Sequence, residues 1–550
     1  MDSLGIALLM LLAVVASGAA VRVLPAALPL PLPLVQIALG ALIAAFTQHG
    51  VRLEPDLFFF LFLPPLLFLD GWRIPKDGLF RDRGIILQLA LGLVVFTVLG
   101  LGFFIHALIP SMPLPVAFAL AAVVSPTDPV AVSAITERVA MPRRLLHILE
   151  GESLLNDASG LVAFRFAVAA AASGAFSLHE AALSFAWVAA GGVAVGTGFT
   201  WLVTNAKSAF SRRWGEEPGS EILISLLIPF GAYALAEKAG TSGILAAVAA
   251  GVAMSYAELR GTTLAVTRVQ RTAVWNTLQF TLNGVMFVLL GEQLPDLLHG
   301  AVRVVTEAGH ANPWWLLVYT LAINVALAAL RFVWVWTSMQ MALWRSRRRG
   351  HVLRRAPPRL TLAVSLAGVR GAVTLAAVLT LPEMLREGVP LPARDLAIFL
   401  AASVIVVSLL LASATLPRVL SGLHFPPETE HHSQEDLAMR ASREAAAQAV
   451  ERTLREVIDA EPDADPQPYT DIASRLMEVV GPRAGDETGR PDDADQRRKE
   501  GEVAARMRQA ALRAARDELF RLARERRISD EVAREAVRRL DMQEARGPRT

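Results

Sequence analysis

Long apolar stretches recur from the start of the chain to about Leu423 and then stop, and no other feature constrains the fold as strongly. A helix needs roughly 20 apolar residues to cross the ~30 Å hydrocarbon core of a bilayer. In lipid, every backbone polar group must be bonded within the protein, so such stretches are predicted to be membrane helices. Thirteen segments approach or exceed this length, at about 4–21, 26–46, 56–70, 83–109, 113–136, 146–173, 179–204, 220–238, 241–256, 274–298, 314–343, 360–382 and 395–420.

The composition agrees with a protein that is solvated mainly by the lipid bilayer. Of the 550 residues, 53% are hydrophobic and only 19% are charged. The chain has no cysteine, which excludes disulfides and thiolate metal sites, and its formal net charge of +2 gives no reason to expect a nucleic-acid partner. The first apolar stretch resembles a signal peptide, but Met1–Gly5 carries an acid and no Lys or Arg. We therefore expect an all-α membrane protein with an uncleaved first helix.

The distribution of Lys and Arg predicts the orientation, because these residues accumulate in cytoplasmic loops. Basic clusters follow the odd-numbered segments, for example at 73–83, 138–144 and 345–359. The loops after even-numbered segments hold few basic residues: Arg52, Arg303, Arg386 and Arg394, with Lys238 at a helix end. We expect a multi-pass membrane protein, with its N-terminus outside and its C-terminus in the cytoplasm.

The composition changes beyond Phe425 to Ala, Arg, Glu and Asp. Helical runs are predicted near Glu435–Asp459 and Lys499–Met542, separated by Pro-, Gly- and Asp-rich stretches at 461–468 and 481–494. The predicted domains are thus a transmembrane domain at 1–422 and a helical cytoplasmic tail at 423–550. Two roles fit this tail: it regulates the protein or supports a dimer, or it is only a solvated amphipathic segment. The tail has no nucleotide-binding motif, which argues against ATP as the energy source.

The fifth segment is predicted to be interrupted at its centre. Pro126 and Pro129 flank Thr127 and Asp128 there, and each proline removes an amide donor and clashes with the preceding turn. Unwound backbone at membrane depth is tolerated where it is packed in protein or lines a wet cavity. A simple proline kink is the alternative, but an aspartate between the prolines adds a cost that a kink does not need.

The sixth segment carries a polar stripe on one helix face. Glu152 and Asn156 are four residues apart, as are Ser153 and Asp157. Hydroxyl, amide and carboxylate oxygens suit a partly dehydrated Na⁺, which we place at Asp157 and Ser153, with Thr127 on the facing segment. Burial disfavours a charged carboxylate, so a proton would compete with the cation for Asp157. The alternative is that these side chains only bond neighbouring helices.

The twelfth segment is predicted to contain a second interruption, because Gly368 and Gly371 flank Arg370 at its centre. Interrupted helices in corresponding positions of two halves indicate an inverted-repeat transporter with its site where they cross. We expect Arg370 to balance helix C-terminal carbonyls and Asp128 to balance helix N-terminal amides. Both would be supporting charges. Asp70, near the border of the third segment, is a further site candidate.

The sequence resembles the sodium/proton exchanger family that includes the bacterial NhaP proteins and the animal NHE proteins. The resemblance covers roughly segments two to thirteen and implies an NhaA-like fold and a homodimer with a mobile core and a scaffold. It also implies that Asp157 is the ion- and proton-carrying acid, with Thr127, Ser153 and Asn156 around it. The matching strings are FLPPLLFLDGW at 62–72, SPTDPVAV at 125–132, LLHILEGESLLNDASGLV at 145–162, AEKAGTSGILAAVAAGV at 236–252, NGVMFVLLG at 283–291 and GVRGAV at 368–373.

Two further expectations follow from the resemblance. Glu152 matches the glutamate that pairs with an arginine on a later helix, which maps best onto Arg331. The pair Asn156–Asp157 stands where electrogenic relatives have two aspartates, which favours one cation per proton.

We therefore expect a secondary antiporter, not an enzyme, that needs no cofactor and exchanges Na⁺ or Li⁺ for H⁺ electroneutrally, serving pH homeostasis. K⁺/H⁺ exchange at the same site is the alternative, because oxygen ligands alone select weakly between cations. A channel would need a continuous pore with repeated filter elements. An intramembrane hydrolase would need a His or Lys base at membrane depth beside Ser153 or Ser159. We find neither in the sequence.

Some residues depart from the family pattern or lack a role. Glu292 follows NGVMFVLLG where an apolar residue is expected. Arg165 lies eight residues after Asp157, and its predicted partner is Asp70 or Glu150. Four histidines at helix borders are interpreted as surface residues, namely His49, His106, His147 and His179.

Overall fold

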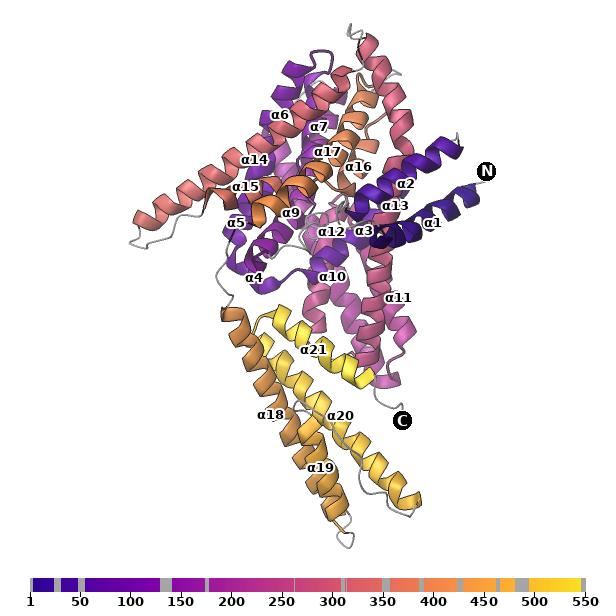
Figure 1. Cartoon of the computed structure of the whole chain (residues 1–550), viewed down its shortest axis with the longest axis vertical. Helices are drawn as coiled ribbons and strands as arrows, with labels where there is room; N and C mark the ends of the chain where they lie inside the picture. The colour runs from indigo at the N-terminus through magenta and orange to yellow at the C-terminus, as the bar shows by residue number, and fades with distance from the viewer. Residues whose placement is uncertain are drawn as a thin grey trace.

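The protein consists of a large helical membrane part and a tail of helices below it (Figure 1). The computed structural model describes residues 3–23, 31–47, 55–128, 141–173, 178–261, 263–307, 312, 314–348, 357–384, 390–421, 423, 429–460, 465–479 and 494–545. The helices of the membrane part are α1 (Ser3–Val23), α2 (Leu32–Thr47), α3 (Pro55–Arg73), α4 (Lys76–Arg81), α5 (Arg83–Leu87), the π-helix η1 (Gln88–Leu93), α6 (Val94–Leu108), α7 (Leu114–Val124), α9 (Arg143–Ser173), α10 (Leu178–Trp214), α11 (Pro218–Lys238), α12 (Gly243–Glu258), α13 (Ala265–Glu307), α14 (Trp314–Arg348), α15 (Pro358–Leu366), α16 (Ala372–Leu379) and α17 (Arg394–Leu420).

The helices confirm the predicted all-α membrane architecture. Among the described residues, seven helical stretches are long and apolar enough to cross a membrane, and four shorter helices are also apolar. Each of the thirteen predicted segments overlaps one or more of the helices above. The exact number of membrane crossings stays a prediction, because some of these helices are shorter than the hydrocarbon core.

Both predicted interruptions are present, and they meet. α7 ends at Val124 and is followed by non-helical residues up to Asp128, while residues 367–371 separate α15 from α16. The two breaks are joined by a backbone hydrogen bond in which the amide of Asp128 donates to the carbonyl of Val369 at 2.8 Å. Pro129 and the rest of the fifth segment lie outside the described residues. The freed backbone groups of one break are thus partly satisfied by the other.

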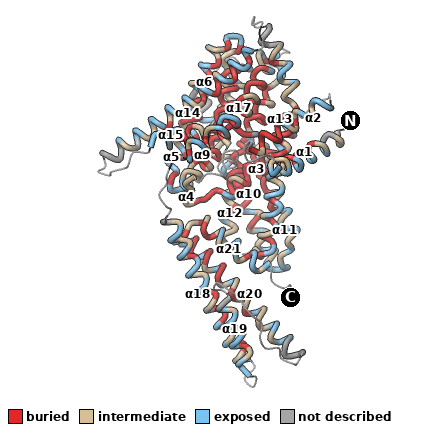
Figure 2. Tube along the Cα trace, viewed as in Figure 1, coloured by how far each residue is buried: buried red, intermediate tan, exposed pale blue. Residues whose placement is uncertain are grey.

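Small residues allow the helices of the membrane part to approach closely. α2 packs along α13, and α12 packs along both α3 and α10. A Cβ at Gly291 on α13 would overlap the carbonyl oxygen of Ile37 on α2, and a Cβ at Gly40 would overlap that of Val288. Backbone-to-backbone contact of this kind is the usual packing device where lipid supplies no hydrophobic driving force between helices. Buried residues accordingly run through the centre of the membrane part (Figure 2).

Gly291→Ala is expected to lower the stability of the protein by about 1–3 kcal/mol, because the new methyl group meets backbone that cannot rotate away. Thermal unfolding in detergent measures the effect. Gly198→Ala on α10 is the control, since no described atom lies within 4 Å of its new Cβ, and alanine favours a helix over glycine. An unfolding temperature of Gly291→Ala equal to that of the wild type would contradict the close contact.

The tail is made of four described helices: α18 (Thr429–Ala460), α19 (Gln467–Val479), α20 (Ala494–Arg524) and α21 (Asp530–Ala545). The helical run predicted near Lys499–Met542 consists of two helices. A turn at 525–529, where Arg526 has a φ of 56°, separates α20 from α21. The turn lets Ile528, Val532 and Val537 fold back onto Leu519 and Phe520 and form a small apolar core. α19 was not predicted.

Candidate functional site

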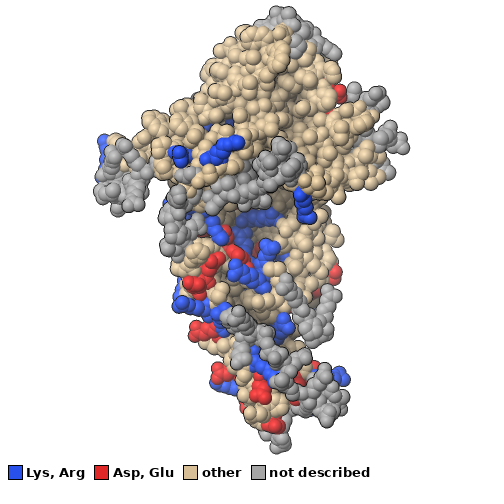
Figure 3. Space-filling view, in the orientation of Figure 1, with Lys and Arg blue, Asp and Glu red and all other residues tan. Residues whose placement is uncertain are grey.

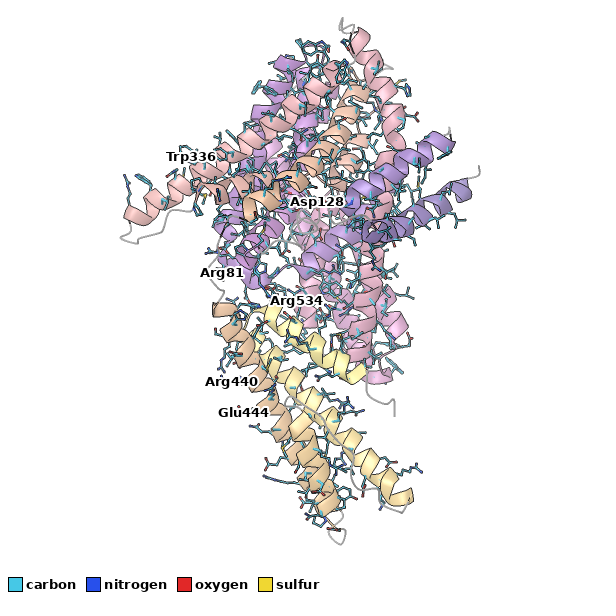
Figure 4. The ribbon with its side chains drawn as sticks, viewed as in Figure 1. Arg81, Asp128, Trp336, Arg440, Glu444 and Arg534 are labelled. Atoms are coloured by element: carbon cyan, nitrogen blue, oxygen red, sulfur yellow. The ribbon has the colours of Figure 1, made fainter. Side chains whose placement is uncertain are left out.

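The two breaks place opposite charges at opposite helix ends. Arg370 donates from Nε to the carbonyl of Val124 at 2.8 Å and from Nη1 to the carbonyl of Gly368, so its guanidinium group faces the C-terminal carbonyls of α7 and the end of α15. Arg370 thus contacts helix C-terminal carbonyls, and its role as a supporting charge stays a prediction. Asp128 lies against Gly371, the N-cap residue of α16, where an added Cβ would overlap the carboxylate. Figure 4 shows Asp128 in the middle of the membrane part.

The polar stripe of α9 lies directly beside the first break. Asn156 donates from Nδ2 to the hydroxyl of Thr127 at 3.0 Å, and that hydroxyl donates to Glu152 Oε1 at 3.4 Å. Ser153 and Asp157 are buried, with 6% and 8% exposure. The structure therefore brings together Thr127, Ser153, Asn156 and Asp157, as the sequence predicted, because i, i+4 spacing puts the α9 residues on one helix face.

A small cavity of about 40 Å³ lies at this point. It is large enough for a dehydrated ion or a water molecule. Its polar lining comes from Asp70, Thr127, Asp128, Ser153, Asp157, Gln279, Asn283 and Thr374. The carboxylate, hydroxyl and amide oxygens in this set are the hard ligands that suit an alkali cation.

Two buried oxygens near the cavity lack a hydrogen-bond partner among the described residues. They are Asn156 Oδ1 and Ser125 Oγ. A buried acceptor without a partner costs the free energy of its lost hydration, and a cation or a water molecule restores it. The polar groups at the break are therefore not saturated by the protein alone.

Glu152 and Arg331 form the predicted ion pair between α9 and α14. Both arginine nitrogens Nη1 and Nη2 donate to the carboxylate, the second at 2.9 Å, and Nε donates to the carbonyl of Val364 on α15 at 3.1 Å. The two side chains are almost fully buried. The pair therefore neutralises the Glu152 charge and ties three helices together.

Sequence reasoning missed a polar row on α13. Gln279 and Asn283 line the small cavity, and Arg73 donates to Gln279 Oε1 at 2.6 Å and to Asn276 Oδ1 at 2.5 Å. Asn276, Gln279 and Asn283 follow i, i+3, i+7 spacing within an apolar segment. This periodicity was the available signal, because polar residues on one face of a membrane helix point away from lipid.

A larger cavity of about 610 Å³, here called the vestibule, leads from the small cavity toward the tail. The two cavities share Asp70, Ser153, Gln279 and Asn283. The charged and titratable residues that line the vestibule are Asp70, Arg73, His147, Glu150, Glu531 and Arg534. Figure 3 shows charged side chains gathering between the nearly uncharged upper surface and the tail.

Two expectations about individual residues are wrong. Arg165 contacts neither Asp70 nor Glu150; its Nη2 lies 3.4 Å from Glu237 Oε1 on α11, because eight residues of helix carry it about 12 Å past Asp157. His147 is not a free surface residue, since its side chain is 14% exposed and contacts Glu531 of the tail at 3.2 Å.

Glu292, for which the sequence offered no role, lies outside the candidate site. This carboxylate is buried on α13 and lines neither the small cavity nor the vestibule. His106 contacts the carbonyl of Met112 at 2.9 Å. His49 and the side chain of His179 lie outside the described residues.

Comparisons with known proteins identify the family. The family described as "Sodium/hydrogen exchanger, transmembrane" matches residues 9–422. The "Uncharacterized Na(+)/H(+) exchanger YjcE" of Escherichia coli is 39% identical over 98% of this chain and 97% of its own length. The "Sodium, potassium, lithium and rubidium/H(+) antiporter" of Bacillus pumilus is 44% identical over 75% of this chain and 60% of its own length.

The solved structures support the fold. The sodium proton antiporter MjNhaP1 from Methanocaldococcus jannaschii superposes with a TM-score of 0.57 at 18% identity, over 75% of this chain and 97% of that protein. The family match spans most of the chain and the Escherichia coli relative nearly all of it. The chain belongs to the sodium/hydrogen exchanger family.

Proposed function

We propose that this protein exchanges Na⁺ or Li⁺ for H⁺ across the membrane, one for one, by competition of the two ions for Asp157. The observation that carries the proposal is the position of this carboxylate. It is buried beside the unwound Thr127 and next to Ser153, in a cavity that continues into the vestibule. Carboxylate, hydroxyl and amide oxygens can replace part of the hydration shell of the cation.

The surrounding charges leave Asp157 as the group that cycles. Glu152 is paired with Arg331, and Asp128 lies at the N-terminus of α16 opposite Arg370. A proton or a monovalent cation gives the Asp157 site the same net charge, whereas an empty carboxylate would carry its charge through an apolar environment. Alternating access would thus be favourable only with one ion or the other bound. This is the physical basis of obligatory, electroneutral exchange.

K⁺/H⁺ exchange at the same site is the second candidate. The Bacillus pumilus relative is named for sodium, potassium, lithium and rubidium, and a set of oxygen ligands alone discriminates weakly between alkali cations. We place Na⁺ first because the matching family model and the solved structure of MjNhaP1 are both named for sodium.

Reconstitution into liposomes with an interior pH dye tests the proposal. External Na⁺ or Li⁺ is expected to raise the interior pH, with a smaller response to K⁺, and the initial rate is expected to stay unchanged when valinomycin clamps the voltage. A response to K⁺ at least equal to that to Na⁺ would favour the second candidate. A severalfold change of rate under the clamp would exclude one-for-one exchange, and no response to any alkali cation would overturn the proposal.

We also propose the arrangement of the protein in the cell. A transmembrane exchanger domain at 1–422 and a cytoplasmic tail at 423–550 fit the inner membrane of a bacterium, with the N-terminus outside. In support, the tail contacts loops that follow the third, fifth and ninth predicted segments, all of which carry Lys and Arg. A homodimer and a role in pH homeostasis rest on the family resemblance.

A further inference from the structure

The tail helix α21 forms part of the vestibule wall. Arg534 donates from Nη1 to the carbonyl of Trp72 at 3.1 Å and from Nη2 to the carbonyl of Ile74 at 3.3 Å. These carbonyls belong to the end of α3 and the turn after it, so Arg534 contacts the C-terminal end of the helix that carries Asp70. Its side chain lines the same cavity as Asp70 and Glu150. Figure 4 shows Arg534 where the tail meets the membrane part.

α21 is held in this position by several charged contacts. Arg268 of α13 donates to both carboxylate oxygens of Asp541 at 2.7 and 2.6 Å, and both side chains are buried. Asp530 accepts from the amide of Lys76 at 3.2 Å and from Arg534 at 2.9 Å. These contacts fix the Arg534 guanidinium group at the vestibule.

Two side chains at the contact between α21 and the membrane part, Lys76 and Glu531, have shifted pKa values. Burial lowers the pKa of Lys76 to about 8, although the nearby Asp530 acts in the opposite direction. Burial would raise the pKa of Glu531, but its hydrogen bond with His147 and the charges of His147 and Arg143 hold it below its ordinary value. Glu531 is therefore ionised at neutral pH and contributes a negative charge at the same rim.

We propose that Arg534 is a tethered positive charge in the cation vestibule, which lowers the local concentration of the entering cation against the opposing charges of Asp530 and Glu531 on the same tail helix. The guanidinium group stays charged at every physiological pH. Arg534 lines the same vestibule as Asp70 and Ser153, so its charge acts on a cation in that space. That the permeating ion is a cation rests on the proposed function. That Arg534 makes the potential of the vestibule more positive does not.

The expected effect follows from Coulomb's law. One unit charge about 10 Å away, at an effective dielectric constant between that of protein and water, changes the local concentration of a monovalent ion about threefold. The effect should shrink between low salt and physiological ionic strength, where the Debye length falls from about 30 Å to about 8 Å. Arg534→Gln removes the charge, whereas Arg534→Lys keeps it and loses the two-carbonyl contact.

The absence of native cysteine provides a test that does not depend on transport. Leu146→Cys introduces a single thiol into the vestibule wall of the full-length protein. Its rates of modification by a cationic and an anionic methanethiosulfonate reagent report the local potential. Adding Arg534→Gln is expected to raise the cationic-to-anionic rate ratio about tenfold at low salt, since the two rates change about threefold in opposite directions. Arg534→Lys and the control Arg539→Gln, an exposed arginine on the same helix, should leave the ratio near the parent value.

Transport in liposomes provides the second readout. Arg534→Gln is expected to lower the apparent KM for Na⁺ about threefold at low salt with a smaller change in kcat, while Arg534→Lys stays close to wild type. An unchanged rate ratio in Arg534→Gln, or an equal change in Arg534→Lys, would overturn the inference. If the wild-type protein moves no protons in response to cations, the proposed function fails, and the thiol measurement still decides the role of Arg534.

Discussion

Asp157→Asn is expected to reduce cation-evoked proton movement to the level of protein-free liposomes, while the protein remains folded. The amide has nearly the shape of the carboxylic acid, but it neither binds a proton at physiological pH nor carries the charge that attracts a cation. Asp157 is buried in the small cavity with Ser153 and Thr127. Of the other acids beside it, Glu152 is paired with Arg331 and Asp128 lies at the N-terminus of α16, so we expect neither to replace it.

The same pH-dye assay measures this loss, with thermal unfolding in detergent to verify the fold. Asp296→Asn is a suitable control, because this acid of α13 is exposed and lines neither the small cavity nor the vestibule. It should transport like wild type. Persistent exchange in a folded Asp157→Asn protein would move the ion site to another carboxylate, and Asp70 in the same cavity would be the first to test.

Arg331→Met should be the most destabilising single substitution among those considered. It leaves the Glu152 carboxylate buried without its partner, at a cost of about 3–5 kcal/mol. It also removes the donor to the carbonyl of Val364. Thermal or denaturant unfolding in detergent, followed by tryptophan fluorescence, measures the change in the free energy of unfolding.

A double mutant separates the charge from the lost packing. Adding Glu152→Gln removes the unpaired charge and keeps an oxygen that can accept from Thr127, so the double mutant should regain most of the lost stability. Arg165→Met is the matched control, because this arginine is 55% exposed and its contact with Glu237 should contribute at most about 1 kcal/mol. A double mutant no more stable than Arg331→Met would show that the buried charge is not the cause.

Much of the site was predictable from local sequence. The spacing of Ser153, Asn156 and Asp157 puts them on one face of a helix whatever the helix packs against. The proline at 126 and the glycines around Arg370 indicate interrupted helices for equally local reasons. That the two interruptions face each other was predicted only through the inverted-repeat argument, and the bond from Asp128 to Val369 bears it out.

Partners across helices were harder to predict. Arg331 was found through the family resemblance and not through its spacing, and Arg165 was assigned to the wrong acids. The partner of a long charged side chain depends on which helix lies beside it and at what depth. The polar row of α13, formed by Asn276, Gln279 and Asn283, could have been found by its periodicity. Periodicity alone does not say which cavity the row faces.

Local sequence patterns were enough to place this protein in a membrane, to locate its helices approximately, to show where two of them are interrupted and to single out the acid in a polar stripe. These properties depend on hydrophobicity and helix geometry over a few neighbouring residues. The assembled fold was needed to show which buried charges are compensated, that the site opens into a vestibule, and that Arg534 of the tail lies in the vestibule wall. Those features join residues up to 462 positions apart, and their energies depend on distance and burial that no local pattern encodes.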